Sequence, residues 1–199
     1  MNMPIQRRDF ESQVTFFNQL YKLPVAPYPT TYYEVAAGAG ITFHKDEAAQ
    51  VTILIRRLTN FKHILTEELQ EVNDIIMSLQ TGFHVKKGEV VAPPTAYTEM
   101  DFLTDLADWL GDISVFCASE MIRYGIPVKE TLAIIMSSNF SKLGANGDPI
   151  YDSRGKVQKG PGYWKPEPQL KVMLQERVAE HAPAHSTDLS RSIIWRAHE

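Results

Sequence analysis

Apolar residues recur at helical spacing in five stretches of the chain, and turn-forming residues separate these stretches. We expect helices over residues 6–22, 46–79, 99–124, 127–143 and 167–180. Gly82, Gly125 and Gly144 follow three of them, as glycine commonly does after the last turn of a helix. Because no internal repeat is visible, the pattern predicts a single all-α bundle.

The segments between the predicted helices are rich in glycine and proline. Residues 30–46 predict a loop or a short pair of strands, 81–98 a connecting loop, and 144–168 a stretch without helical periodicity. We therefore expect one all-α domain over residues 1–180, followed by a C-terminal tail of unassigned role over 181–199.

One position interrupts the apolar seam of the second predicted helix. Steps of three and four residues define this seam, which comprises Val51, Leu54, Leu58, Phe61, Leu65, Val72, Ile75 and Leu79. The same steps place Glu68 in the seam. Glu71 lies on the same side of the helix, and Glu67 borders the pair. A carboxylate therefore takes a position where a core side chain is expected.

The third predicted helix carries a row of four acids spaced 4, 3 and 4 residues apart: Asp101, Asp105, Asp108 and Asp112. An unpaired buried carboxylate costs several kcal/mol or stays protonated. If the glutamates of the second helix face Asp108 and Asp112, the helix pair needs a cation between its members. Ligation by carboxylate oxygens alone favours Mg²⁺, with Mn²⁺ as the other candidate. The predicted metal ligands are Glu68, Glu71, Asp108 and Asp112.

Two other interpretations of these acids stay open. Rows of charge are commonly solvated helix faces, which suits the aspartates taken alone but not Glu68 in its apolar seam. A di-iron carboxylate bundle needs Glu-x-x-His on two helices. His63 precedes Glu67 by four residues, and the third predicted helix contains no histidine.

Several carboxylates around a metal leave an excess of negative charge, so an anionic substrate needs cations elsewhere. Asn139 and Lys142 share a face at the end of the fourth predicted helix, where they could hold phosphate oxygens. Lys159 lies in the loop that follows, near Tyr163, whose ring could stack on a base. The alternatives are a lysine that satisfies helix carbonyls, for Lys142, and a solvated turn, for the loop.

The overall composition limits the partners of the chain. Its 199 residues include 20 Lys+Arg and 24 Asp+Glu, a formal net charge of -4. Binding to duplex DNA or to an anionic membrane needs a basic surface, so neither is expected. Cys117, the single cysteine, excludes an internal disulfide framework and a thiolate zinc cluster. With no apolar leader or membrane-length apolar stretch, we expect a cytoplasmic protein.

Four ordered motifs carry a family resemblance. They are Glu67-Glu68-Leu-Gln-Glu71, Asp108-Trp-Leu-Gly-Asp112, Ser-Asn139-Phe-Ser-Lys142 and Lys159-Gly-Pro-Gly-Tyr163. Together they resemble the all-α nucleoside triphosphate pyrophosphohydrolases, in particular the phosphoribosyl-ATP pyrophosphohydrolase-like, MazG-related branch. The resemblance spans residues 10–29 and 50–170.

This resemblance implies a four-helix-bundle-like core with a loop-rich C-terminal segment. It implies Mg²⁺-dependent hydrolysis between the α and β phosphates of a nucleotide, which releases a nucleoside monophosphate and pyrophosphate. The expected substrate is a nucleoside triphosphate, or more narrowly phosphoribosyl-ATP or a deoxynucleotide such as dUTP or dCTP. Members of the family commonly form homo-oligomers, so a dimer or tetramer is expected.

The family's metal ligands come from a Glu-Glu-x-x-Glu and a Glu-x-x-Asp motif. In this chain Glu68, Glu71 and Asp112 match, but Trp109 stands where the second motif has its glutamate. Asp108 would replace that ligand, with Asp105 as the other possibility.

The resemblance also implies roles outside the metal ligands. Glu67, or a hydroxide on the metal, would activate the attacking water. The residues expected to hold the substrate are Asn139, Lys142, Lys159 and Tyr163. The departure at Trp109 leaves a second interpretation open, in which the chain is a degenerate member that binds nucleotides or supports an assembly without turnover.

Overall fold

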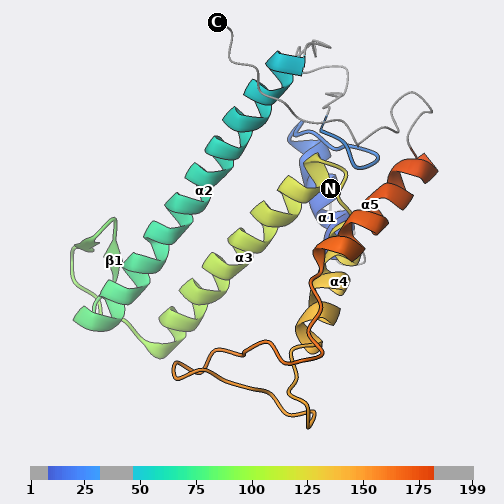
Figure 1. Ribbon diagram of the computed structural model, residues 1–199. Coiled ribbons are helices and arrows are strands. Elements are labelled where there is room, and N and C mark those ends of the chain that lie inside the picture. The colour runs from blue at the N-terminus through green and yellow to red at the C-terminus, as the bar shows by residue number, and fades with distance from the viewer. Residues whose placement is uncertain (1–8, 32–46, 182–199) are drawn as a thin grey trace, which may run out of the picture. The chain divides into compact units, whose positions relative to one another are not determined.

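A computed structural model of the chain describes residues 9–31 and 47–181. The described residues form the helices α1 (Phe10–Leu20), α2 (Glu47–Thr81), α3 (Glu99–Arg123), α4 (Val128–Phe140) and α5 (Glu167–His181), and the strands β1 (Val85–Lys86) and β2 (Glu89–Val90) (Figure 1). The all-α fold class is therefore confirmed. Within the described residues, no helix combines the length and the apolar character that a membrane crossing requires.

The predicted helices differ from the observed ones mainly at two ends. Helix α1 starts at Phe10, after Asp9, whose side chain accepts a hydrogen bond from the Ser12 amide at 2.9 Å and caps the helix. Helix α4 ends at Phe140, three residues earlier than predicted. The Ser141 hydroxyl donates to the Ser138 carbonyl at 2.7 Å, which satisfies a carbonyl left open at this end.

The segment 81–98 is more ordered than the predicted connecting loop. Strands β1 and β2 pair antiparallel, with Val85 opposite Val90. Lys87 and Gly88 join them with φ values of 54° and 79°, as a type I′ turn requires. The sequence signal that could have indicated this hairpin is the Lys-Gly pair between two short β-forming stretches. Of the predictions for residues 30–46 and for the tail over 181–199, the parts over 32–46 and 182–199 lie outside the described residues.

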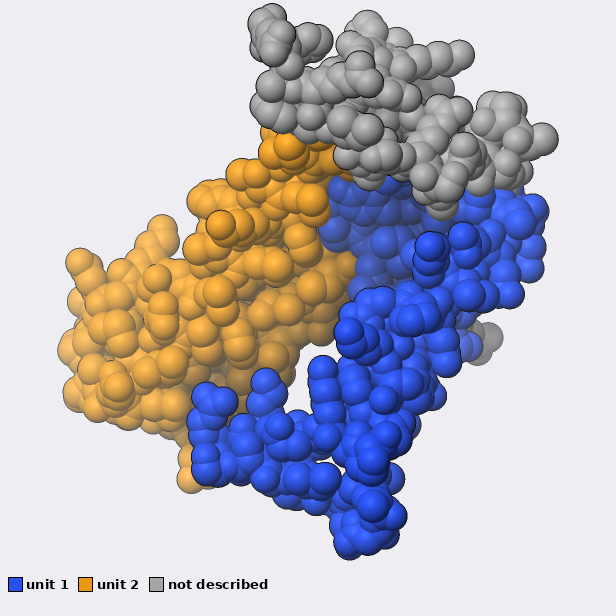
Figure 2. Space-filling model, in the orientation of Figure 1, with its two compact units in different colours: residues 1–43, 119–191 blue, residues 44–118, 192–199 orange. Residues whose placement is uncertain are grey.

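The chain divides into two compact units (Figure 2). The hairpin unit comprises the described residues 47–118, and the terminal unit comprises 9–31 and 119–181. How far a single domain extends stays a prediction.

In the hairpin unit, α2 and α3 run side by side in opposite directions, and the β-hairpin joins them (Figure 1). The hairpin is fixed to α2 by side chains of that helix. The Asp74 carboxylate accepts hydrogen bonds from the amides of Lys87 at 2.6 Å and Gly88 at 2.9 Å. The hydroxyl of Ser78, which is buried, accepts one from the Val85 amide at 2.9 Å. The turn after α2 is thereby held against the helix.

Polar side chains connect the elements of the terminal unit. The side chain of Asn18, fully buried in α1, donates to the Ser119 carbonyl at 3.2 Å and accepts from the Ser119 hydroxyl at 2.7 Å. Glu11 accepts hydrogen bonds from the amides of Val128 at 3.1 Å and Lys129 at 3.0 Å. It therefore caps α4, whose N-cap residue, Pro127, offers no side-chain hydrogen bond.

Gly125 and Gly82 provide a matched test of the close approach between Gly125 and Tyr28 in the terminal unit. Both follow a helix and have positive φ, but a Cβ on Gly125 would lie 2.0 Å from the Tyr28 carbonyl oxygen, whereas one on Gly82 would meet nothing. We expect Gly82→Ala to lower the free energy of unfolding by about 1 kcal/mol, through backbone strain alone. Gly125→Ala should lower it by about 3 kcal/mol or more, because backbone atoms must also move. Urea unfolding followed by circular dichroism measures both, and equal losses would contradict the close approach.

Candidate functional site

Glu68 lies buried in the hairpin unit, as its place in the apolar seam predicts. The residue is 7% exposed, and its Oε2 atom has no hydrogen-bond partner among the described residues. Burial raises the pKa of Glu68, and the negative charges of Glu71, Asp112, Glu67 and Asp108 raise it further. A buried carboxylate with no partner and like charges around it is destabilising in the ionised form.

The acids around Glu68 have exposed side chains. Glu71, Asp108 and Asp112 are exposed, and the carboxylates of Asp108 and Asp112 make no hydrogen bond within the described ranges. Glu67 is also exposed and lies 3.4 Å from the ring of His63, measured between Oε1 and Nε2. The four acids are close enough for their charges to act on Glu68, yet they keep the freedom to change rotamer.

The row of aspartates along α3 divides into two halves. The Asp101 carboxylate accepts hydrogen bonds from the amide and the hydroxyl of Thr98, at 2.8 and 2.6 Å, and these bonds lower its pKa. It therefore serves the N-terminal cap of α3. The Asp105 carboxylate accepts a hydrogen bond from the Tyr97 hydroxyl at 2.8 Å.

The partner of Asp105 comes from the segment between the hairpin and α3. Burial, followed by the bond to Asp105, raises the pKa of Tyr97 to about 12, so this hydroxyl stays a donor at neutral pH. The half of the row that is already hydrogen-bonded thus ends at Asp105. This favours Asp108 over Asp105 as the acid that acts together with Asp112.

Trp109 makes a contact that the sequence did not predict. Its indole nitrogen donates a hydrogen bond to the Glu68 backbone carbonyl at 2.8 Å. An indole holds no metal, but this one joins α3 to α2 at the residue that carries the buried carboxylate. The sequence marked Trp109 only as a departure from an expected glutamate, since no sequence signal identifies the backbone atom that a side chain will reach.

The donor set fits a hard divalent cation. It offers carboxylate oxygens, one of them buried without a partner, and such oxygens are the ligands that Mg²⁺ and Mn²⁺ prefer. Among the described residues, no three acidic, histidine or cysteine side chains converge as they stand on a point that could hold an ion. Ligation by this set therefore requires the exposed acids to turn toward Glu68.

The predicted phosphate-binding residues lie in the terminal unit, around the end of α4. The Lys159 ammonium lies 4.6 Å from the centre of the Tyr163 ring. The neighbouring Gly160 passes the chain just after Lys142 so closely that a Cβ there would lie 1.7 Å from the Leu143 carbonyl oxygen. Asn139 is exposed at the last turn of α4. These residues share one region, and their relation to the carboxylates of the hairpin unit stays a prediction.

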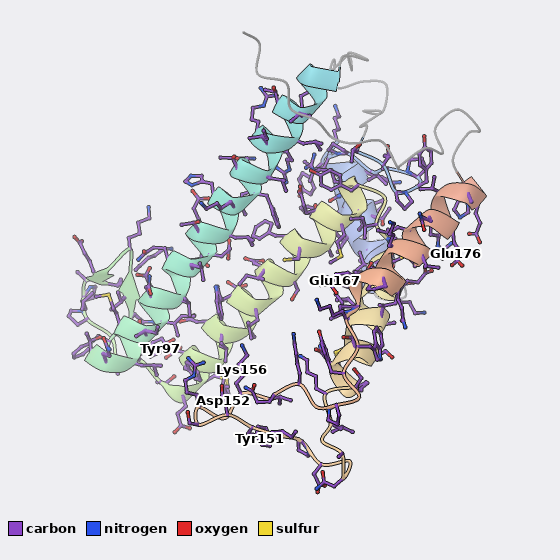
Figure 3. The ribbon with its side chains drawn as sticks, viewed as in Figure 1. Tyr97, Tyr151, Asp152, Lys156, Glu167 and Glu176 are labelled. Carbon is purple, nitrogen blue, oxygen red and sulfur yellow. The ribbon has the colours of Figure 1, made fainter. Side chains whose placement is uncertain are left out.

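The loop between α4 and α5 holds a turn that is ordered by side-chain hydrogen bonds. The Asp152 carboxylate accepts hydrogen bonds from the amides of Arg154 and Lys156, both at 2.9 Å. Tyr151 and Val157 pair across the turn, and Figure 3 shows Tyr151, Asp152 and Lys156 on it. The turn presents basic side chains in an exposed position.

One of the solved structures that are similar to this chain is a crystal structure at 1.78 Å resolution of a protein from Exiguobacterium sp. 255-15 that is provisionally named an NTP pyrophosphohydrolase. The similarity has a TM-score of 0.42 and 21% sequence identity, and it covers 87% of this chain and 99% of that one. Neither a protein family nor a curated protein matches the chain. A likeness at this level does not establish what the chain does.

Replacing Glu68 should show the cost of its burial as a dependence of stability on pH. Its pKa lies above the ordinary 4.5 only in the folded state, so the folded chain loses stability as pH rises above that value and Glu68 ionises. With divalent ions chelated, Glu68→Gln should be more stable than the wild type at about pH 7, and its advantage should vanish below about pH 4. Urea unfolding across this range measures the difference.

Glu176→Gln, an exposed change on α5, serves as the control and should show no such trend. A Glu68→Gln chain that is less stable than the wild type at every pH would show that the carboxylate does not destabilise the folded state.

Proposed function

We propose that the chain is a nucleotide pyrophosphohydrolase that uses Mg²⁺, or Mn²⁺, to cleave between the α and β phosphates of a nucleotide. The observation that carries the proposal is the buried, unpartnered Glu68 carboxylate, with four other acids around it. A fold keeps such a group at a cost to its stability, which points to a function in holding a cation. The order of the four motifs supports the substrate class.

The proposed ligands are Glu68, Glu71, Asp108 and Asp112. Glu68 is fixed by burial, and the other three turn toward it from exposed positions on α2 and α3. Mg²⁺ held there would neutralise phosphate charge and make a water molecule easier to deprotonate. The acids themselves set the charge that selects a divalent cation.

Glu67 is the proposed group that takes the proton from the attacking water. It directly precedes the buried Glu68 on α2 and is exposed, so it can reach a water molecule near the ligands. His63, 3.4 Å away, can hold the Glu67 carboxylate in place by donating a hydrogen bond to it.

The proposed substrate contacts are Asn139, Lys142, Lys159 and Tyr163. The amide of Asn139 and the two ammonium groups supply donors for phosphate oxygens. The Lys159 ammonium already lies over the Tyr163 ring, so the ring can orient this lysine. A nucleotide base would then stack on a part of the Tyr163 ring that the ammonium does not cover. A nucleoside triphosphate or a related nucleotide is the proposed substrate.

We also propose that the chain forms a homo-oligomer, a dimer or a tetramer. Helix α2 carries large apolar side chains that are more than half exposed: Ile55, Leu58, Leu69 and Leu79. Apolar rows of this kind on a long helix suit packing against another helix.

A second candidate function is favoured by Trp109. The indole occupies the position at which the resemblance implies a metal-binding glutamate, and its hydrogen bond to α2 is structural. A chain with this change could bind nucleotides, or support an assembly, without turnover. Turnover measurements separate the two functions.

The first test is release of pyrophosphate from a panel of nucleotides in the presence of Mg²⁺. The panel should include the common triphosphates, dUTP, dCTP and phosphoribosyl-ATP. We expect a nucleoside monophosphate and pyrophosphate, with no turnover by Glu68→Gln and unchanged turnover by the control Glu176→Gln. Running the reaction in ¹⁸O-labelled water shows which phosphorus is attacked. Binding of nucleotides without hydrolysis of any would favour the second candidate function.

The second test separates the two halves of the aspartate row by metal affinity. Because Tyr97 engages Asp105, we expect Asp105→Asn to change the dissociation constant for Mn²⁺ by no more than about twofold, whereas Asp112→Asn should raise it about tenfold or more. Titration calorimetry of the nucleotide-free protein measures both constants. A larger effect at Asp105 than at Asp112 would place the ligands one turn nearer the start of α3.

A further inference from the structure

The bond between Trp109 and Glu68 joins the two helices of the proposed metal site at one defined point. Its donor is the indole nitrogen and its acceptor is the Glu68 backbone carbonyl, 2.8 Å away. Within an α-helix this carbonyl already accepts from the amide four residues later, and its second lone pair can take a further donor. The indole can therefore bind α2 without breaking a helical hydrogen bond.

The place of this bond matters because of what lies next to it. On α2 the acceptor belongs to the same residue as the buried carboxylate. On α3, Asp108 directly precedes Trp109, and Asp112 lies three residues later, on the neighbouring part of the helix surface. The bond thus fixes the backbone of Glu68 relative to the turn of α3 that carries both aspartates.

Apolar packing provides little else to fix the register of these helices. Among the residues of the hairpin unit whose burial is described, only three apolar ones are buried: Val51, Ile75 and Ala118. A slide of one residue along a helix moves an atom by about 1.5 Å. Mg²⁺ demands oxygen distances of about 2.0–2.1 Å in near-octahedral geometry, so a slide of that size would break the ligand set.

We propose that Trp109 is a positioning residue for the metal site, and that its indole N–H sets the register at which Glu68 meets Asp108 and Asp112. This inference rests on the proposed function, from which it takes the metal site. It concerns a residue that binds neither the metal nor the substrate. It gives the tryptophan a role at a position where the resemblance implies a ligand.

The test compares Mn²⁺ binding by Trp109→Phe and Phe102→Leu, in the absence of nucleotide. The first variant keeps an aromatic ring but removes the donor, and the second shortens a half-buried side chain two turns away on α3 without touching a hydrogen bond. We expect Trp109→Phe to raise the dissociation constant about tenfold, as loss of an orienting partner typically does, and Phe102→Leu to change it no more than about twofold. Urea unfolding of both variants shows whether their losses of stability are comparable.

A second measurement reports on the bond itself. In ¹⁵N-tryptophan-labelled protein, the Trp109 indole N–H should exchange with solvent more slowly than a free indole, and Trp109→Phe identifies its resonance.

Excess Mg²⁺ should restore turnover to Trp109→Phe but not to Glu68→Gln, because only the latter lacks a ligand.

The inference is overturned if both variants weaken Mn²⁺ binding equally, if Trp109→Phe leaves it unchanged, if the indole exchanges freely, or if the wild type binds no Mn²⁺. The proposed function fails separately, if the wild type binds Mn²⁺ through Glu68 and hydrolyses no nucleotide. Metal binding and turnover are therefore read independently.

Discussion

The desolvation of one carboxylate is the constraint on which the rest of the hairpin unit depends. Glu68 takes a core position on α2, where its Oε2 atom has no partner within the described residues and its pKa is raised by burial and by neighbouring acids. Nothing in the packing of a helix pair requires a charge there, and an apolar side chain of similar size would stabilise the pair. The cost becomes understandable if the group exists to hold a cation.

The roles of the surrounding polar residues can be understood from that constraint. The acids of α3 nearest its start are hydrogen-bonded, Asp101 to Thr98 and Asp105 to Tyr97, so they serve the fold. Asp108 and Asp112 make no such bond in the described part of the chain. The tryptophan between them reaches across to the Glu68 carbonyl. The first half of the aspartate row thus has structural roles, and the second half has the proposed metal-binding roles.

Much of this arrangement could be predicted from the sequence, because periodicity and helix-ending glycines are local signals. The bounds of α2, α3 and α5 agree with the pattern to within two residues, and the buried Glu68 follows from its place in the seam. The β-hairpin was missed because a pair of two-residue strands is too short to show alternation. The bond made by Trp109 joins residues 41 apart in the sequence, and no residue pattern carries that information. The bond of Tyr97 to Asp105 spans eight residues, but it depends on how the irregular segment before α3 folds back onto the helix.

The most direct test of the account is the thermal unfolding of the nucleotide-free protein as Mg²⁺ is added. An ion that binds only the folded state raises the unfolding temperature with concentration. The account predicts such a rise for the wild type and none for Glu68→Gln, which should begin more stable than the wild type near neutral pH. A wild type that gains no stability from Mg²⁺, or a Glu68→Gln chain that gains as much, would contradict the claim that this buried carboxylate is there to hold a cation.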